Sequence, residues 1–479
     1  MNILFAAVEC FPFAKVGGLG DVIGSLPQEL NKLQNDCRVI MPFYKTIKPE
    51  LVKDVKEVAS FKVFLGKKSY DVSLLSEVYN GVTYYFVKND EFYGRDRVYD
   101  FPDEESRWAL FQISVIEAMK ALKNEFMVHI LNCHDWHTGM IPYLIKSKYY
   151  SEFGQVKTIY TIHNVLYQGE YERQTTRQIF NVEVVDEIEH NAKLNFMKAG
   201  IMCSTFVNTV SQTYAKELLN SDFLGKGMTQ YLKERYKQGR FVGIINGIDF
   251  ETWNPMTDKD IPVNYSFENY REGKLAAKKV LYDKLGVDFY TNVPCIGLVS
   301  RLTQQKGLDL IMEIAEDLIS DCTFKFIIVG SGEAKYEEFF KELERKHPFK
   351  VKCYLGYSDE LAHLVYAASD MFLMPSLFEP CGLGQMIALR YGSLPIVRET
   401  GGLKDSVEPY NEFALTGNGF SFTNYNSHDM LYVIKYAFRH FNGYPEHWDI
   451  LVDNAMASDY SWTVSAKKYL LLYVKALKS

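Results

Sequence analysis

Short apolar runs alternate with longer amphipathic segments from one end of the chain to the other. In the first part, this pattern predicts a strand at Ile3–Val8, a helix over 21–34 and a strand at Cys37–Met41. The second part repeats the pattern, with predicted elements at 296–300, 307–319, 324–329 and 333–346. Such alternation is typical of parallel sheets covered by helices on both faces. The sequence therefore predicts an α/β protein with two Rossmann-like, doubly wound domains.

The boundary between the two domains is expected within 240–260. An apolar run closes at Ile244–Asp249, and Trp253-Asn254-Pro255 opens a polar stretch. We accordingly divide the chain into three parts, over 1–245, 246–461 and 462–479. The last part alternates lysines with apolar residues at helical spacing, which predicts a C-terminal helix.

Length, charge and cysteine spacing exclude several classes of protein. A chain of 479 residues is too long for a single core. The net charge of −7 provides no basic field for a nucleic acid. The first apolar run is too short for a signal peptide, and no stretch of about 18 apolar residues is present. The eight cysteines form no C-x-x-C pair, so we expect reduced thiols, a cytoplasmic location and no membrane contact.

A glycine-rich turn, Lys15-Val16-Gly17-Gly18-Leu19-Gly20-Asp21, joins the first strand to the first helix. Backbone N–H groups at a helix start can bind a diphosphate, and Lys15 adds a positive charge. The glycines do not have the dinucleotide-binding spacing, and the second strand ends in Met41-Pro42 rather than an acid. A nicotinamide dehydrogenase therefore fits poorly. The alternative, at a prior of about one half, is a tight turn with Lys15 solvated and Asp21 as the helix N-cap.

Two cations follow the first strand of the second domain, at Arg301 and Lys306. Ligands of α/β proteins bind at the carboxyl ends of parallel strands. A departing nucleoside diphosphate gains negative charge, which these cations would stabilise in the transition state. The alternative is an ordinary solvated pair, at a prior of about one third.

A second glycine turn, Phe378–Gln385, follows the apolar run Met371–Pro375. Amides of Gly382 and Leu383 would face an anion, and Glu379 could hold hydroxyls of a donor sugar. Cys381 reads as a packed thiol rather than a nucleophile. More backbone donors are offered by Thr400-Gly401-Gly402-Leu403.

Histidines and acids also end two strand-like runs of the first domain, at Asn132–His137 and Thr161–Val165. Structural or substrate-positioning histidines are favoured over a metal site, because His134-x-x-His137 lacks helical ligand spacing. We interpret Asp258-Lys259-Asp260 as a solvated loop and expect no metal. The aromatic residues Tyr93 and Trp136 are candidates for stacking on a sugar ring.

Taken together, these motifs resemble those of the glycogen and starch synthases that use ADP-glucose. They occur in the family's order along nearly the whole chain. The motifs are 15–21, His134-Asp-Trp-His137, Thr161-Ile-His-Asn164, Asn246-Gly-Ile-Asp249, Ser300-Arg-Leu302, Gln305-Lys-Gly307, 378–383, Ala388–Gly392 and Thr400–Leu403.

The resemblance implies the GT-B architecture, in which two Rossmann-like domains face each other across a deep cleft and a C-terminal helix returns to the first domain. It implies transfer of glucose from ADP-glucose to the non-reducing 4-OH of an α-1,4-glucan, with retention of configuration, in glycogen biosynthesis. ADP-glucose and glycogen would be the partners, and neither a metal nor pyridoxal phosphate is expected. The oligomeric state stays open.

Residue roles implied by the resemblance fall into four groups. Catalytic roles go to His163, Arg301, Lys306 and Glu379. Donor-binding roles go to Lys15, Gly18, Asn246, Gly382, Leu383, Thr400 and Gly401. Acceptor-side roles go to Asp135 and Tyr93, and the remaining motif members are Asp21, Asn164 and Cys381.

One position departs from the pattern of many retaining GT-B transferases, which carry a second glutamate eight residues after the first. Here that position is Ile387, so only Glu379 carries over. The ADP-glucose synthases share this departure. Two rivals stay open: a phosphorylase, which would hold pyridoxal phosphate on a lysine, and a non-catalytic glucan-binding protein with the same fold.

Overall fold

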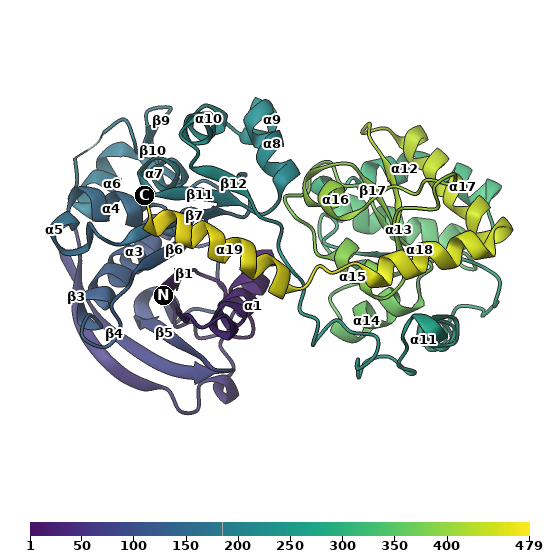
Figure 1. Cartoon of the computed structure of the whole chain (residues 1–479), viewed down its shortest axis with the longest axis horizontal. Coiled ribbons are helices and arrows are strands. Elements are labelled where there is room, and N and C mark those ends of the chain that lie inside the picture. Colours follow the sequence, from purple (N-terminus) through teal and green to yellow (C-terminus); the bar gives the residue numbers. More distant parts are fainter. Residues whose placement is uncertain (184) are drawn as a thin grey trace. The chain divides into compact units, whose positions relative to one another are not determined.

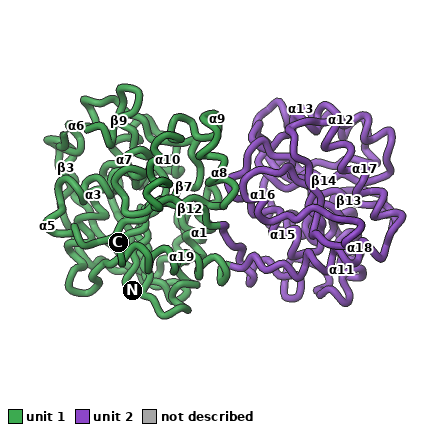
Figure 2. Tube along the Cα trace, turned by 45° about the horizontal axis from the view of Figure 1, so that its top comes forward, with its two compact units in different colours: residues 1–244, 462–479 green, residues 245–461 purple. Residues whose placement is uncertain are grey.

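The computed structural model describes residues 1–183 and 185–479. These residues form two compact units, and the chain passes from the first to the second between Ile244 and Ile245. It returns at Trp462, so unit 1 contains residues 1–244 and 462–479 and unit 2 contains residues 245–461 (Figure 2). Each unit buries a hydrophobic core of its own.

Unit 1 is built on a nine-stranded sheet in the order β12-β11-β7-β6-β1-β2-β5-β4-β3 (Figure 1). The strands from β12 to β5 run parallel, whereas β4 and β3 are antiparallel additions at one edge. The strands are β1 (Asn2–Ala6), β2 (Asp36–Pro42), β3 (Lys56–Leu65), β4 (Lys68–Tyr79), β5 (Val82–Lys88), β6 (Ile130–His134), β7 (Lys157–Ile162), β11 (Phe206–Thr209) and β12 (Phe241–Gly243). A small antiparallel sheet joins β8 (Glu170–Glu172), β10 (Lys193–Asn195) and β9 (Glu189–His190).

The helices of unit 1 cover this sheet. They are α1 (Gly18–Lys32), α2 (Asp90–Tyr93), α3 (Glu104–Ala121), α4 (Met140–Ser147), α5 (Tyr150–Phe153), α6 (Arg173–Phe180), α7 (Phe196–Cys203), α8 (Gln212–Asn220), α9 (Asp222–Gly225), α10 (Thr229–Lys237) and α19 (Trp462–Leu477), with short 3-10 turns η1 (Pro49–Leu51) and η2 (Trp136–Thr138). In α1, apolar residues at intervals of three or four, such as Val22, Leu26 and Leu30, are all fully buried.

The antiparallel additions modify the purely parallel sheet that the alternation of elements predicts. Between β4 and β5 the chain reverses through Asn80 and Gly81, whose φ angles of 47° and 74° suit a two-residue hairpin turn. The burial of β3 mostly alternates between exposed and more buried positions, as in a strand with one solvated face. The Asn-Gly pair is the signal from which this hairpin could have been predicted.

Unit 2 contains a six-stranded, fully parallel sheet in the order β15-β14-β13-β16-β17-β18. Its strands are β13 (Cys295–Val299), β14 (Lys325–Gly330), β15 (Val351–Leu355), β16 (Met371–Met374), β17 (Leu394–Arg398) and β18 (Phe420–Phe422). Its helices are α11 (Tyr270–Leu285), α12 (Leu308–Asp321), α13 (Ala334–Lys346), α14 (Asp359–Ala368), α15 (Gly384–Arg390), α16 (Gly401–Ser406), α17 (Ser427–Gly443) and α18 (Pro445–Ala457), with turns η3 (Phe267–Asn269) and η4 (Gln304–Lys306). The doubly wound α/β fold is thus confirmed in both units.

The C-terminal helix α19 packs within unit 1, beside α1 and β7 (Figure 1). Tyr473, which is fully buried, donates a hydrogen bond from its hydroxyl to Oδ1 of Asn132 on β6, over 2.6 Å. The Tyr469 hydroxyl accepts one from Asn208 on β11, over 3.2 Å. Two tyrosines therefore attach the last helix to polar residues on two strands of the sheet. Among the described residues, no helix combines the length and hydropathy that a membrane span requires.

Replacing Tyr473 by Phe should destabilise unit 1 by about 1–3 kcal/mol, because Oδ1 of buried Asn132 would lose its partner. The free energy of unfolding from urea denaturation checks this. Leu471→Ala on the same helix is the control, since that side chain is 71% exposed and its loss should change little. Equal stability of Tyr473→Phe and wild type would contradict the role of this bond.

Candidate active site

The predicted residues of unit 2 gather where the order of its sheet reverses. The chain runs outward from β13 to β14 and β15 on one side, and from β13 to β16, β17 and β18 on the other. Arg301 follows β13, and Glu379 follows the neighbouring strand β16. Ligands of open parallel sheets bind outside the carboxyl ends of the strands at such a switch point. The fold thus places these residues at its favoured binding position.

Lys306 and Glu379 form an ion pair at this switch point. The Lys306 ammonium donates to Oε2 of Glu379 over 2.7 Å, and the Ser376 hydroxyl donates to the same oxygen over 3.0 Å. The two charged side chains are only 15% and 8% exposed. Arg301 lies five residues before Lys306 in the sequence, and it is exposed. The second carboxylate oxygen of Glu379, Oε1, takes no part in these bonds.

Glycine turns bring bare backbone close to Glu379. Gly401 has a φ of 45°, and a Cβ there would lie 1.8 Å from the carbonyl oxygen of Glu379. Gly382 has a φ of 72°, and its Cβ would lie 2.6 Å from Oε1 of Gln385. Only glycine fits both positions. Leu383 is the N-cap of α15 and Thr400 the N-cap of α16, so the structure brings these predicted donor-binding residues to one edge of the sheet.

Cys381 and Asn246 are packed beneath these turns. Cys381 is 5% exposed, and burial raises the pKa of its thiol to about 12, which is the behaviour of a packed thiol. Asn246 is 4% exposed, and its backbone N–H faces the Cys381 sulfur. Oδ1 of Asn246 has no hydrogen-bond partner within the part of the chain that the structure describes. An unpaired buried acceptor of this kind suits a residue that awaits a ligand.

The predicted residues of unit 1 lie at the corresponding switch point of its own sheet. There the chain runs from β1 to β2 on one side and from β1 to β6 on the other. The glycine turn 15–21 follows β1, and Asp135 follows β6. His163 and Asn164 follow β7, the next strand outward. Loops distant in sequence therefore meet at one edge of the sheet.

The glycine turn differs in two respects from the alternative of a tight turn with Lys15 solvated and Asp21 as the N-cap. Gly17, in an extended conformation, is the N-cap, and α1 begins at Gly18, so Asp21 lies in the first turn and is not the N-cap. The Lys15 ammonium is not simply solvated, because it pairs with Asp21 over 2.7 Å while staying 40% exposed. A carboxylate therefore pairs with Lys15 in unit 1, as one pairs with Lys306 in unit 2.

Asp135 is held by backbone from a neighbouring strand end. Its Oδ1 accepts the N–H of His163 over 2.8 Å, and the N–H of Asn164 also bonds this carboxylate. Asp135 has a φ of 55°, a strained value for an aspartate. Burial raises the pKa of this carboxyl to about 7, with a smaller contribution from the negative charge of Glu9.

The histidines nearby are buried in their neutral forms. Nδ1 of His134 and Nε2 of His163 lie 2.9 Å apart. Burial lowers the pKa of His163 to about 3 and that of His134 well below its ordinary value. His137 stacks on Trp136 at 4.0 Å and has a similarly lowered pKa. These contacts are typical of structural histidines, and the substrate-positioning role stays a prediction.

The two aromatic candidates have different surroundings. Tyr93 has no exposed surface, and its hydroxyl donates to the carbonyl oxygen of Arg107 over 3.0 Å. A fully buried ring cannot stack on a sugar, so the structure corrects the acceptor-side prediction for Tyr93. Its apolar ring completes the core beneath α2 and α3 instead. Trp136 is partly exposed at the edge that carries Asp135 and remains a candidate.

The Asp258-Lys259-Asp260 segment is only partly the solvated loop that the sequence suggests, because Lys259 and Asp260 are exposed but Asp258 is buried. Asp258 is 5% exposed, and its carboxylate accepts bonds from Nδ1 of His363 over 2.8 Å and from the Tyr391 hydroxyl. Its other oxygen accepts the N–H of Asp260 over 2.9 Å. Asp258, Asp260 and His363 are close enough to hold a metal ion. The hydrogen bonds already made by Asp258 give it a structural role without one.

Three residues at these edges belong to none of the sequence motifs, so the motifs did not indicate them. Glu9 and Ser376 bond the glycine turn and Glu379, respectively. Tyr357 follows β15 and is 77% exposed, so its ring could stack on a nucleobase. A turn sequence such as Gly356-Tyr357 after a strand is the signal that could have drawn attention to it.

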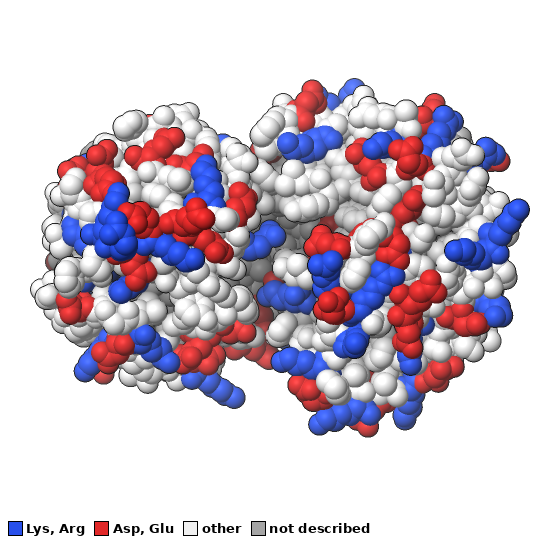
Figure 3. All heavy atoms as spheres, turned by 180° about the vertical axis from the view of Figure 1, so that it is seen from behind, with Lys and Arg blue, Asp and Glu red and all other residues white. Residues whose placement is uncertain are grey.

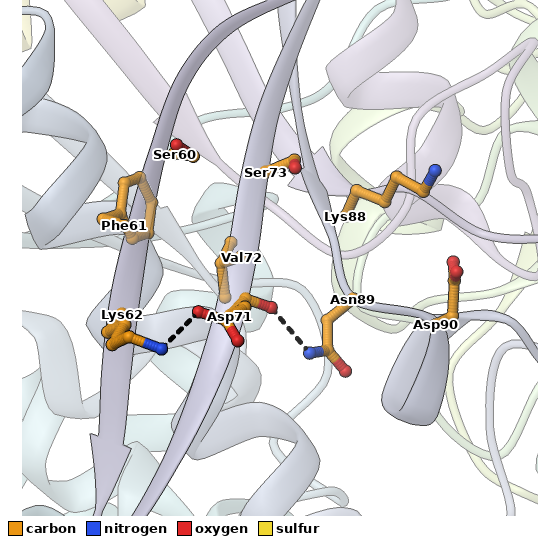
Figure 4. Close-up of a pocket in the computed structure, with 9 residues that line it drawn as sticks. All are labelled: Ser60, Phe61, Lys62, Asp71, Val72, Ser73, Lys88, Asn89 and Asp90. Carbon is orange, nitrogen blue, oxygen red and sulfur yellow. Dashed lines mark hydrogen bonds and ion pairs between the residues drawn. The ribbon is translucent and has the colours of Figure 1, made fainter.

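Two surface hollows lie apart from the predicted residues. One, of about 510 Å³, lies over β3, β4 and the end of β5, where Lys62 pairs with Asp71 and Asn89 donates to the Asp71 carbonyl (Figure 4). The other, of about 630 Å³, is lined by Lys146, Arg235, Arg240 and neighbours at the amino ends of β11 and β12. On the face shown in Figure 3, acidic and basic side chains are intermixed on each unit.

Two family models match the chain, the starch synthase catalytic domain over residues 2–234 and glycosyl transferases group 1 over residues 286–439. The catalytic domain of starch synthase IV from Arabidopsis thaliana, solved bound to ADP and acarbose, has a TM-score of 0.91 at 30% identity, covering 100% of this chain and 99% of that one. Sucrose-phosphate synthase from Thermosynechococcus elongatus shares the fold alone, with a TM-score of 0.60 at 14% identity over 99% of both chains. Two Rossmann-like units with polar residues at both switch points, together with these matches, define a GT-B glycosyltransferase.

Similarity to two glycogen synthases narrows the class of protein further. Glycogen synthase from Geobacillus thermodenitrificans is 42% identical over 100% of this chain and 98% of its own length, and that from Clostridioides difficile is 42% identical over 99% of each. The chain belongs to the glycogen and starch synthase family.

The raised pKa of Asp135 predicts a specific pH dependence of stability. The folded state keeps the proton up to about pH 7, whereas the unfolded carboxyl releases it near 3.8. Raising the pH through this window therefore lowers the free energy of unfolding. Asn at this position cannot titrate, so the stability of wild type relative to Asp135→Asn should fall between about pH 4 and pH 7 and level off above it.

Urea denaturation at a series of pH values measures this difference. The pKa values of His134, His137 and His163 also change on unfolding, because burial lowers them in the folded state, but these histidines are present in both proteins, and so is Glu9. Their contributions therefore cancel to first order in the comparison. If the difference in the free energy of unfolding between the two proteins stayed constant across this pH range, Asp135 would have an ordinary pKa.

Proposed function

We propose that this protein transfers glucose from ADP-glucose to the non-reducing 4-OH of an α-1,4-glucan, with retention of configuration, in glycogen biosynthesis. The names of its relatives and the ADP and acarbose bound by the related starch synthase IV support this proposal. The observation that carries it is the Lys306–Glu379 pair at the switch point of unit 2, flanked by Arg301 and the glycine turns.

Departure of the nucleoside diphosphate is the step that this arrangement assists. The β-phosphate oxygen gains negative charge as the glucosyl bond breaks, and Arg301 and Lys306 stabilise that charge. Glu379 orients the Lys306 ammonium before the donor binds, so less reorganisation is needed during the reaction. Amides of Gly382 and Leu383 add uncharged donors, with Thr400 and Gly401 beside them.

Glu379 has a second part in this proposal. Its Oε2 is bonded to Lys306 and Ser376, which leaves Oε1 for a hydroxyl of the donor glucose. The acceptor hydroxyl attacks the anomeric carbon from the face that the diphosphate leaves, and a leaving phosphate oxygen takes its proton. The bond from the anomeric carbon to that oxygen breaks as the new glycosidic bond forms, so the configuration is retained.

Unit 1 supplies groups for both substrates. We assign Lys15 and Gly18 to the donor diphosphate, His163 to the glucosyl unit near its anomeric carbon, and Asp135 to the acceptor. Lys15 would exchange its bond to Asp21 for one to a phosphate oxygen. The neutral state of His163 suits a hydrogen-bonding role and leaves no fixed positive charge beside the glucosyl unit.

Neither a metal nor pyridoxal phosphate enters this mechanism. Lysine, arginine and backbone amides take the place that a divalent cation has in other transferases. With glycogen as acceptor, release of nucleoside diphosphate should be faster from ADP-glucose than from UDP-glucose and should be unaffected by EDTA. Preference for UDP-glucose, or loss of activity in EDTA, would contradict the proposal, and no release from either donor would favour a non-catalytic glucan-binding protein.

Lys306→Ala should lower the turnover number by about 100-fold or more at saturating donor, because the departing charge loses a cation. Lys352→Ala is a matched control, since Lys352 also pairs with a glutamate in unit 2, over 3.0 Å at similar exposure, but lies on β15. That variant should keep wild-type turnover. A normal turnover number in Lys306→Ala, with the circular dichroism of wild type, would remove Lys306 from the mechanism.

A further inference from the structure

Glu9 is a buried carboxylate that none of the sequence motifs includes. It lies just after β1 and is 5% exposed. Its hydrogen bonds come from two backbone N–H groups and one tyrosine hydroxyl, rather than from a lysine or arginine. A carboxylate removed from water without a cation is costly unless its oxygens are well satisfied. These bonds must therefore be an integral part of the turn that follows β1.

The bonds attach Glu9 to the glycine turn itself. Its Oε2 accepts the N–H groups of Val16 and Gly17 over 2.6 and 2.7 Å, and its Oε1 accepts the Tyr99 hydroxyl over 2.5 Å. Short bonds to an ionised acceptor are among the strong hydrogen bonds in proteins. Tyr99 is itself held by stacking on His137, with ring centroids 5.3 Å apart. Glu9 is thus bonded on one side to the turn and on the other to a packed aromatic cluster.

This arrangement changes which amides are free for a ligand. The N–H groups of Val16 and Gly17, which the sequence offers to a diphosphate, are already bonded to Glu9. They lie immediately before α1, so the carboxylate occupies the position where an anion would meet this helix start. Any anion must therefore be met by Lys15 and by backbone from Gly18 onward. The Lys15 side chain pairs with Asp21 and stays 40% exposed.

A turn with glycines at 17, 18 and 20 has large conformational freedom when it is not held. Backbone bonds also close the two ends of this turn. Cys10 and Ala14 exchange two of them, the N–H of Phe11 donates to the carbonyl of Gly20, and the N–H of Gly20 donates to the carbonyl of Gly17. Without Glu9, the segment between Lys15 and Gly18 would sample many conformations, and donor binding would have to order it. The negative charge itself would not help a diphosphate bind, so the contribution of Glu9 must be geometric.

We propose that Glu9 is a positioning residue, whose carboxylate holds the backbone of Val16 and Gly17 so that Lys15 and Gly18 keep the geometry that receives the donor diphosphate. This inference rests on the proposed function, because it assumes that Lys15 and Gly18 contact the donor. A glutamine at position 9 separates the effect of geometry from that of charge, because it can accept both N–H groups with its one carbonyl oxygen. The glutamine amide group can meanwhile donate to the Tyr99 oxygen.

The test compares Glu9→Ala and Glu9→Gln with wild type. The dissociation constant for ADP, measured by calorimetry, and the KM for ADP-glucose should each rise about 10-fold or more in Glu9→Ala. Both should stay within about 3-fold of wild type in Glu9→Gln. The KM for glycogen should change little in either variant. Hydrogen exchange should be faster at the amides of Val16 and Gly17 in Glu9→Ala and slow in Glu9→Gln.

Glu77→Ala is the matched control, because the Glu77 carboxylate also binds backbone N–H groups, those of Asp54 and Val78, elsewhere in unit 1. It should bind ADP as wild type does. If Glu9→Ala does not fold, Tyr99→Phe, which removes one of the three bonds, should give a smaller change in the same direction. Wild-type ADP affinity in Glu9→Ala, or equal weakening in Glu9→Gln, would overturn the proposal.

The same titration on Lys306→Ala separates this inference from the proposed function. If neither Lys306→Ala nor Glu9→Ala changes ADP binding, the donor assignment itself is wrong. If only Lys306→Ala weakens binding, the donor assignment stands and the positioning role of Glu9 fails.

Discussion

The ion pair between Lys306 and Glu379 is the interaction on which the candidate site of unit 2 depends. Two charges that are 15% and 8% exposed can stay in the protein only if each compensates the other. Their contact requires the loops after β13 and β16 to meet, which they do because those strands are neighbours in the sheet. Gly401 then allows the backbone to approach the Glu379 carbonyl. The electrostatic requirement and the packing requirement are met by the same few residues.

At the corresponding edge of unit 1, two carboxyl groups are bonded in a different way, chiefly by backbone amides. Glu9 takes the N–H groups of Val16 and Gly17, and Asp135 takes that of His163. The nearby histidines are neutral because burial lowers their pKa. This edge of unit 1 thus combines neutral histidines with backbone-bonded carboxyl groups, and Lys15 adds an exposed ammonium. Such a surface suits sugar hydroxyls, which need hydrogen bonds of defined direction more than they need charge.

In both units a carboxylate forms an ion pair with the lysine that the proposed function assigns to the donor. Asp21 pairs with Lys15, and Glu379 pairs with Lys306. A pre-paired lysine is held in one orientation, so a phosphate that replaces or joins the carboxylate meets an ordered donor. Because of the same pairing, any other anion must compete with the carboxylate for the lysine. Under the proposed function, affinity for the donor would depend on the strength of these two internal ion pairs.

The sequence by itself determined the two doubly wound domains, the elements at 296–346 and the loops that carry the site. Those features follow from the spacing of apolar residues and from glycines next to charged residues, which act over a few positions. Tertiary structure alone decided that Tyr93 is core, that Asp258 is buried against His363, and that Glu9 holds the glycine turn. Each of these depends on a partner 7 to 105 positions away, and local pattern carries no information about which distant side chain will close a contact.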